Sequence, residues 1–158
     1  MKQVDINRYT KAKETLEDFR CLIPRYIQCK TNPTTLDMFL SRNRNPLFDL
    51  TTTKFWSTGL KSEKAKTTTG KIVRDHYIPR KIATGVIFEF LIKNPKMSVE
   101  EFIVLCLKYG STIDLTHEEH ELITNKAKNS GKCNYELYES VGIKVKGLED
   151  LTKDVKIF

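Results

Sequence analysis

The chain has 158 residues, of which 39% are hydrophobic and 30% are charged. These proportions are typical of a soluble globular protein with one main core, and they exclude a largely disordered chain. No run approaches the roughly 18 apolar residues that a membrane-spanning helix requires, and the first residues form no export signal. We therefore expect a cytoplasmic protein with no membrane partner. The formal net charge of +7 favours a polyanionic partner, because each neutralised phosphate releases condensed counterions.

The spacing of the four cysteines matches neither a zinc knuckle nor a redox pair. One of them, Cys106, lies in the apolar run 102–107, where a reduced thiol packs as a small hydrophobic side chain. A reducing compartment is the expectation that follows. The four residues are Cys21, Cys29, Cys106 and Cys133.

The first predicted element is a helix within residues 7–28, ended or bent just before Pro24 because proline removes a backbone donor. The next segment, 31–53, contains Pro33 and Pro46 and is interpreted as a loop with one or two short helical turns. The apolar residues that recur at helical spacing in the first segment are Leu16, Phe19, Ile23 and Ile27.

A β-hairpin is predicted after this loop. Residues 54–58 and 71–73 have the composition of strands, and the polar run 61–70 is interpreted as the turn region between them. This run is rich in lysine, which is typical of a solvated loop. It also lies shortly before Asp75 and His76, the first pair of candidate site residues.

Two helices with clear boundaries follow. The first covers 80–93, where apolar residues fall on one helical stripe, and an Asn-Pro step ends it. The second has Ser98 as its N-cap and Glu101 three residues later, which together form a capping box. It is predicted to end at Gly110.

A short strand at 111–115 leads into a helix that Thr116 caps. Glu118 and Glu119 fall in its first turn, where they complement the helix dipole, and they are interpreted as surface residues. His120 lies one turn into this helix.

A last short helix is predicted at 135–138, before a charged end. Together these elements predict an α+β fold that is mostly helical, with a small antiparallel hairpin.

Two clusters contain all three histidines of the chain. In the first, Asp75 and His76 are adjacent and cations flank them on both sides. An acid beside a histidine can hold a divalent ion with one side chain and activate water with the other, while the cations receive phosphate oxygens. The structural alternative is that His76 is a satisfied polar residue at a strand end. The second cluster is Thr116, His117, Glu118, Glu119 and His120.

The block Asp75-His76-Tyr77-Ile78-Pro79-Arg80, then helices, a strand and the helix start Thr116-His117-Glu118-Glu119-His120, follow the order of a ββα-metal motif. In these residues the chain resembles the HNH endonuclease superfamily, and more closely a set of small HNH-like proteins of phages and bacteria. The resemblance covers about 55–143. It implies an HNH-like domain there with a helical insert, preceded by a helical and loop extension at 1–54 that packs on it and followed by a tail at 144–158.

The resemblance also implies roles for individual residues. Asp75 and His120 would be metal ligands, and His76 would be the general base that deprotonates water. A third ligand is expected one turn after His120, where Thr124 and Asn125 stand, and Asn125 is the candidate. Ser111 occupies the position of the superfamily's base-orienting Asn. Such an incomplete ligand set suits Mg²⁺ or Mn²⁺ better than a closed zinc site.

We therefore predict a metal-dependent DNA endonuclease in the cytoplasm of a bacterium or an infected host cell. One alternative is an HNH-like phage protein that binds nucleic acid or a partner and has lost catalysis, and another is a purely structural phage accessory protein. The candidate nucleic-acid-binding residues are Arg74, Arg80, Lys81, Lys64, Lys66 and Lys71.

Overall fold

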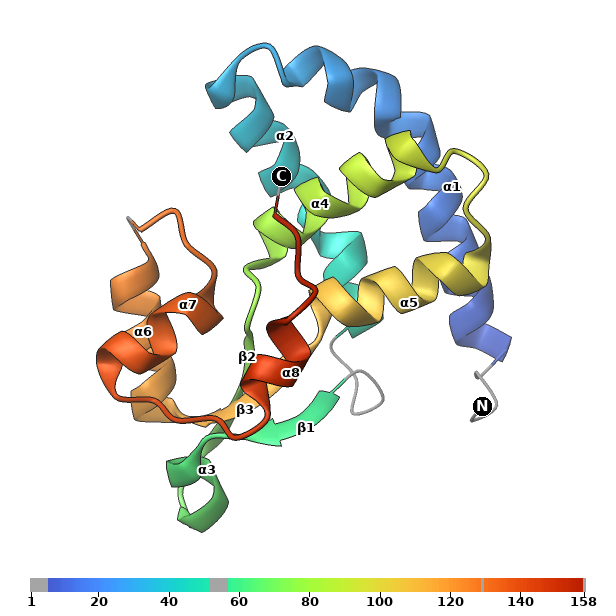
Figure 1. Ribbon diagram of the computed structural model, residues 1–158. Helices are drawn as coiled ribbons and strands as arrows, with labels where there is room; N and C mark the ends of the chain where they lie inside the picture. Colours follow the sequence, from blue (N-terminus) through green and yellow to red (C-terminus); the bar gives the residue numbers. More distant parts are fainter. Residues whose placement is uncertain (1–5, 52–56, 129, 158) are drawn as a thin grey trace.

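The computed structural model describes residues 6–51, 57–128 and 130–157. Its fold is α+β, as predicted, with helices surrounding a small three-stranded sheet (Figure 1). In the described part of the chain, none of the helices has the length and apolar character needed to cross a membrane.

Four long helices pack together on one side of the molecule, and a stack of aromatic rings joins them. They are α1 (Ile6–Cys29), α2 (Pro33–Thr51), α4 (Arg80–Lys93) and α5 (Val99–Gly110). The ring of Phe88 on α4 lies between those of Phe19 and Tyr26 on α1, with centroids 4.8 Å and 4.7 Å away. The buried core continues from these helices into the sheet. The N-terminal helices therefore share one core with the rest of the protein.

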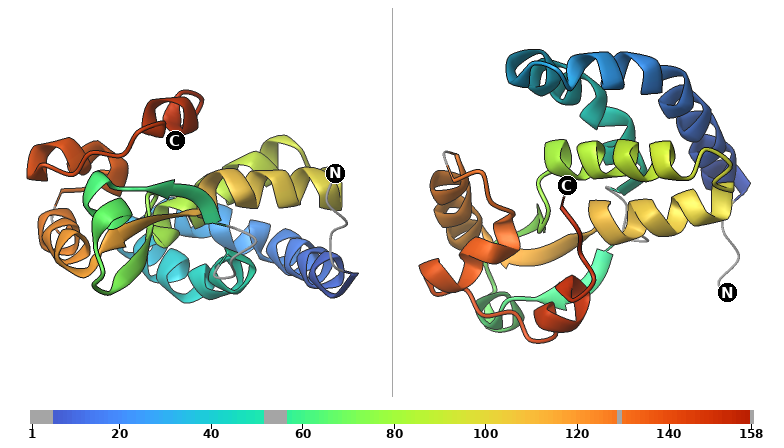
Figure 2. Two further views of the ribbon diagram at one scale, coloured as in Figure 1. Left: turned by 90° about the horizontal axis from the view of Figure 1, so that it is seen from below. Right: turned by 45° about the horizontal axis from the view of Figure 1, so that its top comes forward.

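One of the sequence predictions for the N-terminal third needs correction. Of the two outcomes predicted at Pro24, an end or a bend of the helix, the structure has the bend: α1 continues through Pro24 to Cys29, and Figures 1 and 2 show that its axis changes direction along its length. The segment interpreted as a loop is helix α2. The side chain of Asn32 accepts hydrogen bonds from the backbone N–H groups of Thr34 and Thr35, so Asn32 caps the helix and Pro33 occupies its first position.

The predicted hairpin is wrong in its strand pairing. The strands are β1 (Ser57–Lys61), β2 (Ile72–His76) and β3 (Thr112–Thr116), in the order β1-β3-β2. β3 runs parallel to β1 and antiparallel to β2. Residues 54–56 of the predicted first strand lie outside the described residues. β3 lies between β1 and β2, whereas a hairpin would have paired β1 directly with β2. In this central position, Ile113 and Leu115 of β3 are fully buried.

A short helix replaces the predicted hairpin turn. α3 (Glu63–Thr67) begins after Ser62, whose hydroxyl accepts a hydrogen bond from the backbone N–H of Ala65. Local capping therefore folds much of this lysine-rich run into a helical turn between β1 and β2.

The predictions for the following helices are confirmed. α4 has the expected bounds, and the Ser98–Glu101 capping box is present at the start of α5. Thr116 caps α6 (His117–Ala127), and the chain continues through α7 (Asn134–Tyr138), a 3-10 turn (Glu139–Val141) and α8 (Leu148–Thr152). Antiparallel β2 and β3 followed by α6 thus give a β-β-α unit, with α4 and α5 inserted between its strands.

Candidate functional site

A cavity of about 620 Å³ lies where β2 leads into α4, and α2, α6 and α7 also contribute to its lining. Its volume is in the range typical of ligand sites. The lining includes both members of the Asp75-His76 pair and His120. The β-β-α unit therefore brings the two histidine clusters of the sequence to one place.

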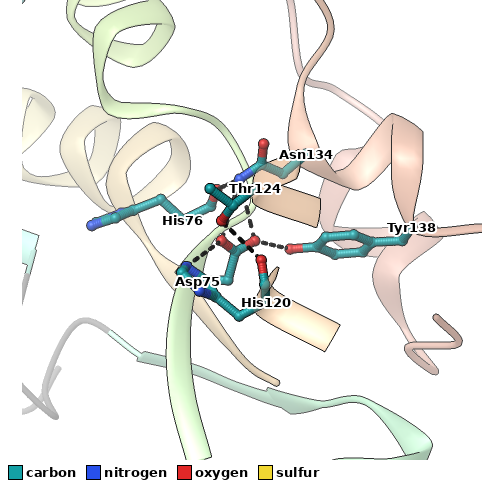
Figure 3. A network of polar contacts seen from close by, with 6 residues as sticks. All are labelled: Asp75, His76, His120, Thr124, Asn134 and Tyr138. Atoms are coloured by element: carbon teal, nitrogen blue, oxygen red, sulfur yellow. Dashed lines mark hydrogen bonds and ion pairs between the residues drawn. The ribbon is translucent and has the colours of Figure 1, made fainter. Parts of the chain in front are cut away.

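Asp75 and His120 converge at the floor of this cavity. Asp75 is the fourth residue of β2 and is only 4% exposed, whereas His120 is in the first turns of α6 and its side chain is 34% exposed. His120 Nε2 lies 3.7 Å from Asp75 Oδ1. Figure 3 shows the imidazole turned toward the carboxylate. Their positions follow from the antiparallel β2–β3 pairing, because β3 leads directly into α6.

Two neighbours from α7 also hold the Asp75 carboxylate. The Tyr138 hydroxyl donates a 2.5 Å hydrogen bond to Oδ2, and the Asn134 amide lies 3.3 Å from both carboxylate oxygens. The same amide donates to the backbone carbonyl of His76 at 2.9 Å. Burial raises the pKa of Asp75, while the bond from Tyr138, the nearby His120 and Asn134 lower it. The carboxylate is therefore desolvated but fixed in orientation (Figure 3).

His76 lines the same cavity from a different direction. Successive residues of a strand point to opposite faces, and Figure 3 shows the His76 ring pointing away from the Asp75 carboxylate. Its Nδ1 lies 3.0 Å from the Gly110 carbonyl oxygen. A carbonyl can only accept, so Nδ1 carries the proton and Nε2 has the basic lone pair. Burial, followed by the charge of Arg80, lowers the pKa of His76 to about 4, against the bond to Gly110.

Ser111 is buried beside this contact, as the C-cap of α5. The group that holds the His76 ring is the carbonyl of the preceding residue, Gly110. This contact therefore comes from the backbone of the residue before the predicted Ser111, and not from the Ser111 side chain. A backbone group leaves no signature in residue types, so the residue types alone could not predict this contact.

The helix places Thr124, and not Asn125, next to His120. Thr124 lines the cavity and its hydroxyl donates to the His120 carbonyl at 2.8 Å. Asn125 is exposed and does not line the cavity. Residues four apart lie on the same helical face, whereas a five-residue step turns about 140° around the axis.

The predicted nucleic-acid-binding residues divide between two places. Arg74, Arg80 and Lys81 line the cavity, and Lys81 also pairs with Asp37 of α2 at 2.5 Å. Lys64 and Lys71 line a separate cavity of about 350 Å³ beside the start of α6. Lys66 pairs with Glu63 at 2.7 Å.

Sequence reasoning missed five residues at the cavity floor and walls. Arg44 went unnoticed because its helix was interpreted as a loop. Asn134 had no recognisable motif, and Tyr138 was interpreted as a core residue or a platform for stacked bases. The missed residues are Arg44, Lys128, Lys132, Asn134 and Tyr138; all line the cavity except Tyr138, which reaches it through its bond to Asp75.

Glu119 is buried, so the interpretation of this residue as a surface carboxylate is wrong. It is 2% exposed, accepts a 2.6 Å hydrogen bond from Ser62 and a 2.9 Å bond from the backbone N–H of Thr116. It completes the cap of α6 and ties that helix to the start of α3. Glu118, by contrast, is exposed as predicted.

Within residues 6–51, 57–128 and 130–157, the structure brings together no group of three or more His, Cys, Asp or Glu side chains suited to a metal ion. The four cysteines are free thiols, and burial raises the pKa of Cys106. Comparison of the chain with protein-family models, curated proteins and solved structures gives no match.

Proposed function

We propose that this protein is a metal-dependent endonuclease that hydrolyses phosphodiester bonds of DNA. The observation that carries the proposal is the convergence of Asp75 and His120, two residues 45 positions apart, within 3.7 Å at the floor of a cation-lined cavity. The β-β-α arrangement around them agrees with the resemblance to HNH endonucleases in the sequence.

The two side chains lie close enough to reach a shared divalent ion after a small movement. Two ligand atoms that are each about 2.1 Å from one octahedral ion stand about 3.0 Å apart at a 90° angle. The separation of His120 Nε2 and Asp75 Oδ1 is longer, 3.7 Å, which is also too long for a direct hydrogen bond. Asp75 and His120 would hold the ion, with water completing its shell, as Mg²⁺ tolerates.

When bound, such an ion would polarise the phosphate and neutralise developing negative charge. His76 supplies the second requirement, a general base. It is neutral at physiological pH because its pKa is about 4, and the Gly110 carbonyl fixes the tautomer in which Nε2 can accept a proton. Arg74 and Arg80 line the same cavity and would bind phosphate oxygens.

A second candidate function is a DNA-binding protein without catalysis. It is favoured by the hydrogen bonds from Tyr138 and Asn134, which already hold the Asp75 carboxylate, and by the two-ligand composition of the site. The Arg and Lys side chains that line the cavity would bind DNA phosphates in this case as well. The two proposals differ in their need for metal, because a binder requires none.

Plasmid cleavage with added Mg²⁺ or Mn²⁺ tests the proposal. We expect metal-dependent cutting by the parent, its loss in Asp75→Ala, and a reduction of about 10² or more in His76→Ala with DNA binding retained. His117→Ala is the matched control, because His117 is exposed and lies outside the cavity. DNA binding without cleavage in either ion would favour the binder, and a His76→Ala variant that cuts at the parent rate would exclude His76 as the base.

A further inference from the structure

The cavity concentrates positive charge well beyond the average of the chain. Among the residues that the structure describes, its lining contains six Lys or Arg side chains and a single carboxylate, that of Asp75. The whole chain has 27 cations against 20 acids. A cavity of one sign attracts ligands of the other sign, and this effect is strongest where protein surrounds the charges.

These cations come from separate parts of the fold. Arg74 and Arg80 flank the junction of β2 and α4, whereas Arg44 belongs to α2. Lys128 and Lys132 lie in the connection from α6 to α7. Figure 1 shows α2 and the α6–α7 region on different sides of this junction. The charges therefore come from elements on different sides of the junction.

Arg44 and Arg80 are held near one another although both are cations. Burial lowers the pKa of Arg80, and the charge of Arg44 lowers it further. Bringing like charges together is unfavourable, and an anion between them relieves the repulsion. In the part of the chain that the structure describes, no carboxylate pairs with Arg44, Lys128 or Lys132.

We propose that Arg44, Lys128 and Lys132 form an outer wall that binds DNA phosphates adjacent to the one at Asp75 and His120. This inference rests on the proposed function and extends it, because it specifies how the substrate lies. The DNA backbone crosses the cavity over the arginines at the β2–α4 junction, with Arg44 on one side and Lys128 and Lys132 on the other. A single phosphate can occupy only one place, so charges on different sides of the junction are matched by a polynucleotide and not by a lone phosphate.

The salt dependence of DNA binding measures these contacts. The outer-wall variant combines Arg44→Gln, Lys128→Gln and Lys132→Gln. The control variant removes the same net charge from exposed lysines that do not line the cavity, through Lys13→Gln, Lys144→Gln and Lys153→Gln. Binding of a fluorescent DNA duplex is followed by anisotropy across a salt series, without added divalent ion.

We expect the outer-wall variant to lose about 0.9 of a unit in the slope of log affinity against log salt for each contact removed, or close to three units in all. The control variant should keep nearly the parent slope. Equal slopes for the two variants would overturn the outer wall while leaving the proposed function intact. No binding by the parent at low salt would overturn both.

If the triple outer-wall variant fails to fold, Lys132→Gln alone provides the test. Lys132 is exposed, so its loss should leave the thermal unfolding midpoint unchanged. Its slope should fall by about one unit, whereas that of Lys144→Gln should not change. Equal slopes for these two single variants would count against the proposal in the same way.

Discussion

The Tyr138 hydroxyl donates a 2.5 Å hydrogen bond to Asp75 Oδ2, and both residues are almost completely buried. The opposite oxygen, Oδ1, is the one that lies 3.7 Å from His120 Nε2. A phenol from the C-terminal part of the chain therefore fixes the carboxylate so that its other oxygen is directed toward the histidine (Figure 3).

Replacing Tyr138 with phenylalanine should destabilise the protein by about 1–3 kcal/mol, because Oδ2 of a buried carboxylate loses its closest donor. The pKa of Asp75 should rise further, since the bond from Tyr138 lowers it. Urea unfolding at neutral pH measures the first effect. Tyr135→Phe, on the same short helix, is the control and should change stability by no more than about 0.5 kcal/mol. Equal unfolding midpoints for Tyr138→Phe and the parent would contradict the assigned bond.

Replacing Asp75 with asparagine should preserve or increase stability at neutral pH. The folded-state pKa of Asp75 is raised, so its ionisation opposes folding: stability is fully present below the unfolded-state pKa and is lost as pH rises through the folded-state value. The advantage of Asp75→Asn over the parent should therefore shrink as the pH falls toward 4. Unfolding curves at several pH values give this difference. The prediction is contradicted if the stability of Asp75→Asn relative to the parent is lower at neutral pH than in acid.

His76 should make the protein sensitive to mild acid. Its folded-state pKa of about 4 lies below the ordinary value of 6.5, so the unfolded chain binds the proton more readily between these values. Stability is then present above pH 6.5 and falls as the pH drops toward 4, by at most about 3 kcal/mol. His76→Gln keeps a donor for the Gly110 carbonyl but cannot titrate. Its stability should vary less over this interval, and an unchanged pH profile would exclude His76 as the source.

Adding a histidine at position 124 should complete a three-ligand metal site. In Thr124→His the new imidazole lies one helical turn from His120 and on the cavity side, so we expect Zn²⁺ or Mn²⁺ affinity to rise at least about tenfold. Isothermal titration measures the change.

Asn125→His is the matched control for this design. It adds the same side chain one residue further along α6, where the helix turns it away from the cavity, and it should leave affinity unchanged. A tighter site in Asn125→His than in Thr124→His would show that the ion does not lie between Asp75 and His120.

The sequence by itself determined the elements whose boundaries depend on neighbouring residues. The Ser98–Glu101 capping box, the Thr116 cap of α6 and the bounds of α4 were all predicted, because these signals involve residues only three or four apart. Two further local signals would have improved the prediction. The Asn32-Pro33 step, as a cap and first helical position, indicates α2, and Ser62, as an N-cap, indicates α3.

Only the tertiary structure decided the order of the strands and the composition of the cavity. β3 is central because Ile113 and Leu115 are buried, and that depends on which surfaces cover them and not on residues nearby in the chain. Because β3 leads into α6, the pairing of β3 with β2 also decides where in space α6 starts. It therefore decides whether His120 lies close to Asp75. Arg44 and Tyr138 reach the site from opposite ends of the sequence through packing, and non-local packing leaves no short-range pattern in the residues it joins.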